Sequence, residues 1–184
     1  MGKFLKWTFI SLLLLAGVMV LAFNILKSNT KKHSPEQVVE YSEGQTDLTV
    51  FYNRPYKNNR EIFGELVPFG EVWRTGANEP TTFSTATDIV IKGKTLPAGK
   101  YTLWTIPGAE SWEVIWNDKD YRWGITMFGG KASREPKYDV LNVTVPLIST
   151  SKTIEQFTIS FEKASPTLFV LEWDHTRVEV PIEE

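Results

Sequence analysis

A series of short segments with apolar residues at alternate positions constrains the fold of this chain more than any other feature. In the closing segment TRVEVPI, Val178, Val180 and Ile182 fall on one face. Arg177 and Glu179 fall on the other face, which is the pattern of a half-buried β-strand. Because side chains alternate strictly between the two faces of a strand, such a segment needs a sheet with one covered side.

Similar segments recur after residue 45, and from residue 81 on they follow one another at short spacing. They are residues 47–53, 81–86, 88–94, 100–106, 111–117, 138–147, 153–161, 167–173 and 176–182. Turn-forming pairs such as Pro107-Gly108 and Asn117-Asp118 separate them, and EWDHTR reads as a tight turn between the last two. The pattern predicts an all-β domain over residues 45–184, an antiparallel β-sandwich of jelly-roll type, preceded by one N-terminal apolar helix.

The N-terminal part of the chain has a different composition. The residues from Trp7 to Leu26 carry no charge and are mostly apolar, and basic residues flank them. At about 1.5 Å per residue, such a helix is roughly 30 Å long, the thickness of the hydrocarbon core of a bilayer. We expect residues 1–26 to form a membrane anchor or signal segment, and residues 27–44 to form a polar tether.

The apolar segment has two interpretations. As an uncleaved anchor, it holds the domain at the outer side of the cytoplasmic membrane, and the membrane is then a partner of this helix. As a signal peptide, it is cleaved after Ala22, because Val20-Leu21-Ala22 provides a small-residue site, and the domain is secreted to the periplasm. The apolar run continues through Phe23, which favours the anchor. Both interpretations place the domain in the cell envelope.

Charge and cysteine content narrow the possible functions. The first 33 residues hold five of the 20 Lys and Arg, which leaves 15 basic against 22 acidic residues and a formal charge of −7 for the remainder. Because the phosphate backbone of a nucleic acid binds clustered Lys and Arg residues, we expect an acidic domain of this kind not to bind nucleic acid. The chain has no Cys, so thiolate nucleophiles, thiolate metal sites and disulfides are absent. The sequence predicts no metal and no cofactor.

The sequence contains few residues that could act in catalysis. The chain has two His residues, His33 in the expected tether and His175 in the expected tight turn, and neither has a second His at metal-ligand spacing. A hydrolase using Glu79 with Glu71 or His175 stays possible, since paired carboxylates suffice for glycoside hydrolysis. We expect a binding domain more than an enzyme, and we assign no catalytic residue.

The densest group of polar residues lies between Asn53 and Glu79. Three arginines, Arg54, Arg60 and Arg74, lie in this irregular segment of an otherwise acidic domain. The planar guanidinium suits bidentate binding of carboxylates or phosphates, so the three could form an anion pocket. Alternatively, they pair with nearby glutamates and hold the long connection together.

The stretch EVWRTGANEP concentrates the remaining candidate ligand-binding residues. Trp73 could stack on a ligand, and Asn78 and Glu79 could orient it, beside the charge of Arg74. The predicted function is the binding of a small polar ligand, anionic or carbohydrate, by a membrane-tethered extracytoplasmic domain. A third possibility is an envelope scaffold or protein-interaction domain, which would expose an apolar patch.

The same stretches carry a family resemblance. NRPYKNNREIFGELVPFGEVWRTGANEPTTF and LPAGKYTLWTIPG, supported by EQFTISF and LEWDHTRVEVPI, resemble a family of exported bacterial proteins known as a domain of unknown function. The likeness covers about residues 35–182, and the V-W-R-T-G-A-N-E core is its distinctive motif. The resemblance implies an export signal followed by one β-rich domain. It implies no activity and no catalytic residue.

Overall fold

The computed structural model describes residues 2–126 and 129–183, so that Met1 and Glu184, the outermost residues of the expected segments, lie outside the described residues. The chain divides into two compact units, a helical unit that ends at His33 and a β-rich unit that begins at Ser34.

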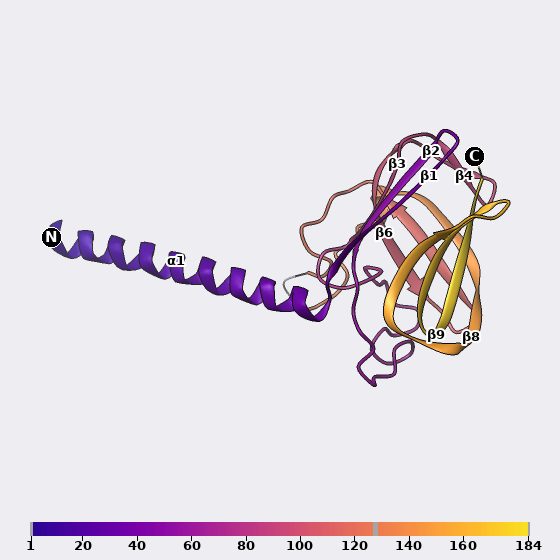
Figure 1. Cartoon of the computed structure of the whole chain (residues 1–184). Helices are drawn as coiled ribbons and strands as arrows, with labels where there is room; N and C mark the ends of the chain where they lie inside the picture. Colours follow the sequence, from indigo (N-terminus) through magenta and orange to yellow (C-terminus); the bar gives the residue numbers. More distant parts are fainter. Residues whose placement is uncertain (1, 127–128, 184) are drawn as a thin grey trace. The chain divides into compact units, whose positions relative to one another are not determined.

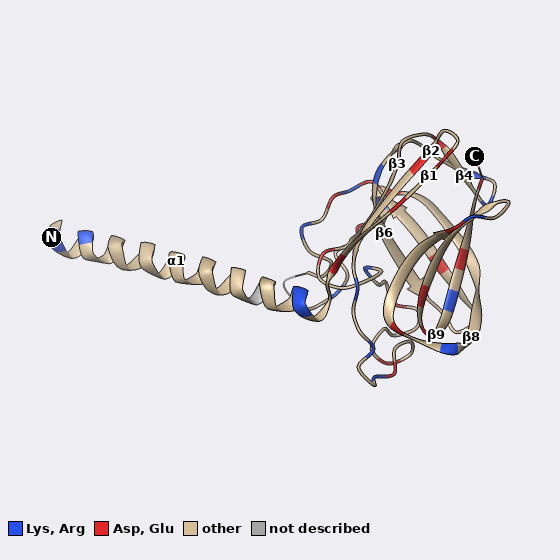
Figure 2. Ribbon diagram, in the orientation of Figure 1, with Lys and Arg blue, Asp and Glu red and all other residues tan. Residues whose placement is uncertain are grey.

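The helical unit is one helix, α1 (Gly2–His33). By length and composition it could cross a membrane, with a mean hydropathy of 2.6 over its most apolar window and no residue of that window buried. Figure 2 shows basic residues at its two ends and none along the middle. The helix ends one residue before Ser34-Pro35, because a residue that precedes proline disfavours the helical conformation.

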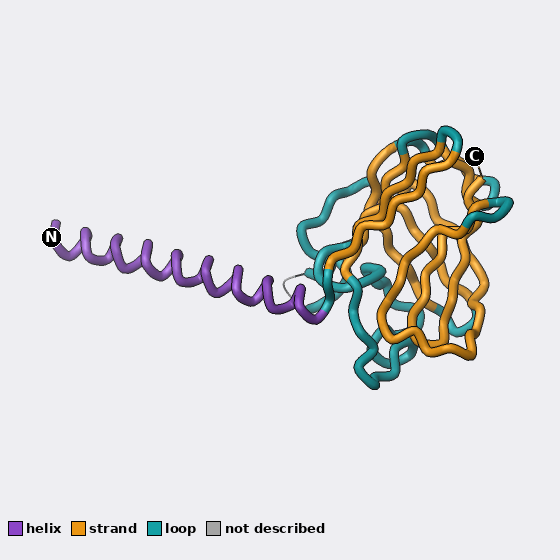
Figure 3. The backbone as a smooth tube through the Cα atoms, in the orientation of Figure 1, coloured by secondary structure: helices purple, strands orange, loops and turns teal. Residues whose placement is uncertain are grey.

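The described strands of the second unit form a single antiparallel sheet in the order β1-β2-β3-β6-β7-β8-β9-β4-β5 (Figure 1). They are β1 (Glu36–Glu43), β2 (Thr46–Asn53), β3 (Thr81–Thr85), β4 (Ile89–Ile91), β5 (Lys94–Leu96), β6 (Gly99–Pro107), β7 (Ser111–Asn117), β8 (Asp139–Glu162) and β9 (Thr167–Glu183), with a 3-10 helix at Pro136–Tyr138. Figure 3 shows the long connections as loops beside the strands. The prediction of an antiparallel, sandwich-like fold is confirmed.

The sheet folds over on itself because β8 is long and irregular. Its first part, up to Pro146, pairs with β7, and its later part, from Leu147 to Glu162, pairs with β9. Its register with β9 shifts twice, between Ser149 and Ile154 and between Ile154 and Thr158. Such bulges bend a strand and increase its twist. One strand therefore takes part in both layers.

Two details of the strand prediction were wrong. The expected strands 138–147 and 153–161 belong, apart from Tyr138, to one strand, β8, and the expected turn EWDHTR is part of one continuous strand, β9. His175 therefore lies within β9, next to Asp174, whose φ of 55° is outside the ordinary strand range. Polar residues at the bend of both strands gave the sequence the appearance of turns, although the backbone continues.

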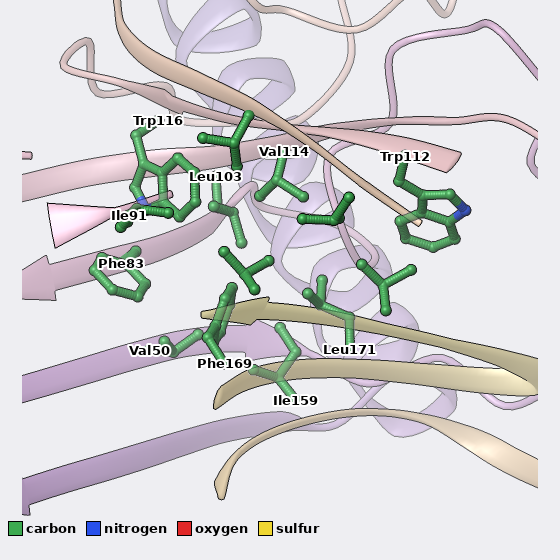
Figure 4. Packing of buried hydrophobic residues seen from close by; sticks show 14 of the residues in the cluster. Val50, Phe83, Ile91, Leu103, Trp112, Val114, Trp116, Ile159, Phe169 and Leu171 are labelled. Carbon is green, nitrogen blue, oxygen red and sulfur yellow. The ribbon is translucent and has the colours of Figure 1, made fainter. Parts of the chain in front are cut away.

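The core lies between the two layers. Phe83, Leu103, Val114 and Trp116 come from β3, β6 and β7, and they face residues of β8 and β9 such as Phe169 (Figure 4). All five of these side chains are fully buried. Burying a side chain of this size stabilises the fold by about 1.5–3 kcal/mol. The alternating apolar positions of the sequence are thus the inward positions of the strands.

The expected polar tether over residues 27–44 differs from the structure. Helix α1 continues to His33, and β1 pairs with the whole of β2, from Glu36 opposite Asn53 to Glu43 opposite Thr46. Of the β1 side chains, Tyr41 alone is buried, so the strand is exposed for most of its length. As an edge strand of the sheet it covers little core, which explains why its sequence resembles a linker.

Candidate functional site

The connection between β2 and β3, residues 54–80, is fixed to β6 by backbone hydrogen bonds. The Trp73 N–H donates to the Thr105 carbonyl (2.7 Å), and the Thr105 N–H donates to the Trp73 carbonyl (3.0 Å). This bridge continues the ladder of β3, where Thr81 pairs with Leu103. The polar motif predicted from the sequence therefore has a fixed place next to a central strand.

Trp73 belongs to the core. Its Nε1 donates to the carbonyl of Gly76 (3.1 Å), and its ring is buried. Four aromatic rings surround it at centroid distances of 5.0–6.1 Å: Phe63, Trp112, Phe157 and Trp173. Because these four rings pack around the indole ring, the geometry does not support the expectation that Trp73 stacks on a ligand.

Asn78 and Glu79 take part in a hydrogen-bonded chain that closes the loop. Asn78 Nδ2 donates to Oδ1 of Asn53 (3.4 Å), and Asn53 Nδ2 donates to Oε2 of Glu79 (3.3 Å). Asn53 is fully buried at the end of β2. Gly76 has a φ of 148°, and a Cβ at this position would lie 2.8 Å from the Asn53 carbonyl oxygen. These residues lock the loop shut, which is one of the two roles that the sequence left open.

Arg54 and Arg60 also hold the backbone in place. Arg54 donates from Nε to the Phe157 carbonyl (3.1 Å) and from a terminal nitrogen to Thr158 Oγ1 (2.9 Å), which ties the connection to β8. Arg60 donates to the carbonyls of Lys57 (2.9 Å) and Tyr56 (2.5 Å) within its own loop. Neither of them lines the cleft that Arg74 lines, so the expected pocket of three arginines is not formed.

Arg74 is the exception in this motif. Its side chain is half-buried, and its Nε is covered by protein atoms without a hydrogen-bond acceptor. Among the described residues, none accepts a hydrogen bond from its guanidinium or forms an ion pair with it. A buried donor without an acceptor costs about 1–3 kcal/mol. The expected pairing of Arg74 with the nearby glutamates is therefore absent.

Burial also affects the ionisation of Arg74. Loss of solvation lowers the pKa of its guanidinium, and no nearby carboxylate contributes to the shift. The guanidinium nonetheless keeps its charge in proteins. A half-buried cation without a protein anion carries an uncompensated positive charge. An anionic ligand would supply the opposite charge and stabilise it.

Arg74 lines a cleft of about 690 Å³. One wall comes from the 66–73 part of the β2–β3 connection, and the other comes from residues 124, 125 and 130–132 of the β7–β8 connection. An antiparallel bridge between Ile125 and Ala132 shapes the second wall. Two segments that are distant in the sequence thus enclose the one arginine of the motif that has no protein partner in the described structure.

Sequence reasoning missed the second wall of this cleft. Gly124, Ile125 and Lys131 contribute to it, and the Gly124 N–H donates to the carbonyl of Asn78 (3.0 Å). The glycines of this connection were the available signal, since glycine permits close approach of two backbones. Only the pairing of the two loops shows which residue the glycine approaches.

The residue pairs expected of a hydrolase are not in contact in the described structure. Glu71 is exposed at the cleft, whereas Glu79 bonds to Asn53. His175 lies in β9, where its ring nitrogens are 3.2 Å from Thr153 Oγ1 and 3.1 Å from the Thr150 carbonyl. Within residues 2–126 and 129–183, no group of three or more His, Asp or Glu side chains could hold a metal ion.

Comparison with models of known protein families assigns the chain to a family. The family model described as "Protein of unknown function (DUF2911)" matches residues 34–182. The chain belongs to the DUF2911 family. The match starts at the first residue of the β-rich unit, so the DUF2911 domain includes β1 as well as the loop motif. The resemblance to a domain of unknown function is thereby confirmed. Neither the curated proteins nor the solved structures gave a match.

Proposed function

We propose that the DUF2911 domain binds a small anion in the cleft between the two connections, with Arg74 as the charged contact. The observation that carries this proposal is the half-buried guanidinium of Arg74, which lines a cleft of about 690 Å³ and has no carboxylate partner in the described structure. Each of the other candidate ligand-binding residues has a hydrogen-bond partner within the protein. An anion supplies the charge and the hydrogen-bond acceptors that Arg74 lacks.

The size of the cleft supports a small molecule. Ligand sites in proteins are typically clefts of roughly 300–1,000 Å³ that contain few polar groups, and the volume here falls within that range. A sugar that stacks on an aromatic ring is less well supported, because the ring of Trp73 packs against other aromatic rings. We therefore favour the anionic over the carbohydrate ligand.

The proposal includes a location. Helix α1 has the length and composition of a membrane span, and we propose that it anchors the domain at the outer side of the cytoplasmic membrane. Cleavage after Ala22 would instead release the domain into the periplasm. The mass of the protein purified from whole cells distinguishes the two, because cleavage removes the residues before Phe23.

Binding is tested by comparing two arginine substitutions in the full-length protein. A panel of organic and inorganic anions is screened for a rise in the melting temperature of the wild type, of Arg74→Met and of Arg60→Met. Both substitutions remove one positive charge, but Arg60 lies outside the cleft and bonds to its own loop. We expect at least one anion to stabilise the wild type and Arg60→Met, and to leave Arg74→Met unchanged. Equal stabilisation of all three proteins would contradict the proposal.

A further inference from the structure

We infer that the ligand is a small monocarboxylate with an apolar body. This inference rests on the proposed function, and it adds the chemical class of the anion. The charge around Arg74 determines the head group of the ligand, and the remaining cleft surface determines its body.

The head group follows from the balance of charges at the cleft. Arg74 is its half-buried cation, Lys131 is exposed, and the exposed Glu71 contributes a negative charge. A second negative charge on the ligand would meet Glu71 and a domain with a formal charge of −7. The planar guanidinium matches the two oxygens of a carboxylate, and a single such group suits a monoanion better than a phosphate dianion.

The apolar body of the ligand is inferred from the side chains that line the walls of the cleft. Leu66, Val67, Pro68 and Val72 line one side of the cleft, and Ile125 lines the other. These side chains offer no hydrogen bonds to a polyhydroxylated or multiply charged molecule. Burial of an apolar ligand chain against these side chains is favourable, and each added methylene group raises the affinity about fourfold. The cleft thus combines one charged contact with apolar walls.

The test is calorimetric titration of the full-length protein in lipid nanodiscs, with empty nanodiscs as the blank. The probes are acetate, butanoate, hexanoate, the neutral analogue hexanamide, the dianion succinate and inorganic phosphate. We expect affinity to rise about fifteenfold from acetate to butanoate and again to hexanoate, because each step adds two methylene groups. Hexanamide should bind at least tenfold more weakly than hexanoate, and succinate more weakly than butanoate.

Two substitutions assign the head group and the body. Arg74→Met should abolish the preference for hexanoate over hexanamide. Leu66→Ser should weaken hexanoate severalfold and leave acetate unchanged, and because Leu66 is 43% exposed the fold should tolerate this change. Ile148→Ser, at a residue of β8 that is 37% exposed and does not line the cleft, is the matched control.

The outcomes separate the inference from the proposed function. Phosphate or succinate could bind at least as tightly as hexanoate, with Arg74→Met abolishing that binding. The monocarboxylate inference would then be wrong, and the proposed anion site would be supported. The same holds if affinity does not depend on chain length. If hexanoate binds the wild type and Arg74→Met equally, or if no anion binds the wild type, both are wrong.

Discussion

Gly124 lies directly against the side chain of Arg74. A Cβ placed on Gly124 would lie 2.9 Å from Cβ and 3.0 Å from Cγ of Arg74, with Cδ closer still. Glycine therefore leaves room for the arginine stem between the two connections. The contact explains how a long, flexible side chain is held in one position although its charged end has no partner among the described residues.

The first prediction concerns this contact. Gly124→Ala places a methyl group where the stem of Arg74 lies, so either the stem or the loop must move. We expect the free energy of unfolding to fall by about 1–3 kcal/mol, the usual cost of overpacking. Anion affinity should fall as well, because the guanidinium is displaced.

A double-mutant cycle identifies Arg74 as the source of that cost. In the Arg74→Ala background, where Cγ and Cδ are absent, Gly124→Ala should destabilise the domain less than in the wild type. Equal costs in the two backgrounds, measured by denaturant unfolding, would show that the two residues are not coupled.

The second prediction concerns the buried Asn53. Asn53→Ala removes the acceptor of the Asn78 amide and a donor to Glu79, at a position that is itself fully buried. We expect the free energy of unfolding to fall by about 1–3 kcal/mol, because buried polar groups lose their partners. Asn142→Ala is the control, since that side chain is exposed on β8, and it should change stability little. Similar values for the two variants would count against the closed hydrogen-bonded chain.

The third prediction concerns Trp73. Trp73→Phe leaves the Gly76 carbonyl without the indole N–H and opens a void among the aromatic rings. We expect a loss of about 2–4 kcal/mol, between a conservative core substitution and full truncation to alanine. Trp7→Phe makes the same chemical change in the exposed helix and should leave unfolding of the domain unaltered. A Trp73→Phe variant as stable as the wild type would mean that the ring is not a core residue.

The fourth prediction is a pH dependence on the outer face of β8 and β9. Arg177 donates to Glu162 at 2.7 Å and also contacts Glu172 and Glu179. The hydrogen bond from Arg177 holds the pKa of the Glu162 carboxyl below its ordinary value of 4.5. A carboxyl with a lowered pKa in the folded state adds stability above the unfolded value, and this stability is lost as the pH falls below about 4.5.

Glu162→Gln tests that linkage. Wild type should exceed Glu162→Gln in stability at pH 7, and the difference should shrink as the pH falls below 4.5, because both side chains are then neutral. In the Arg177→Met background the difference should be small at every pH. A difference that stays constant from pH 7 to pH 3 would contradict the linkage. Urea unfolding across this pH range measures it.

Much of the fold could be predicted from the sequence, and the exceptions have physical reasons. Val178 and Val180 alternate with charged residues, and both are buried in β9 as expected. Strand β1 was missed because it lies at an edge and buries Tyr41 alone among its side chains, so its composition resembles that of a linker. The bend of β9 at Asp174 resembles a turn in sequence, since both favour polar residues with positive φ.

The candidate site was less predictable. The sequence shows that Arg74 lies near Glu71 and Glu79, but sequence distance does not determine pairing. In the structure Glu79 bonds to Asn53, and Glu71 is exposed. Gly124, which contacts Arg74, lies 50 residues further along the chain, and only the docking of the two connections brings them together. Pairing between distant loops has no local pattern in the sequence.

The most direct test of the central claim is the stability of Arg74→Met, measured by denaturant unfolding of residues 34–184. Methionine keeps the stem that packs on Gly124 and removes the charge. If Arg74 is retained for an anion, stability should stay the same or rise by up to about 2 kcal/mol, since an unpaired half-buried charge is lost. A fall of about 3 kcal/mol or more is the cost of breaking a buried ion pair, and it would show that Arg74 holds the fold together.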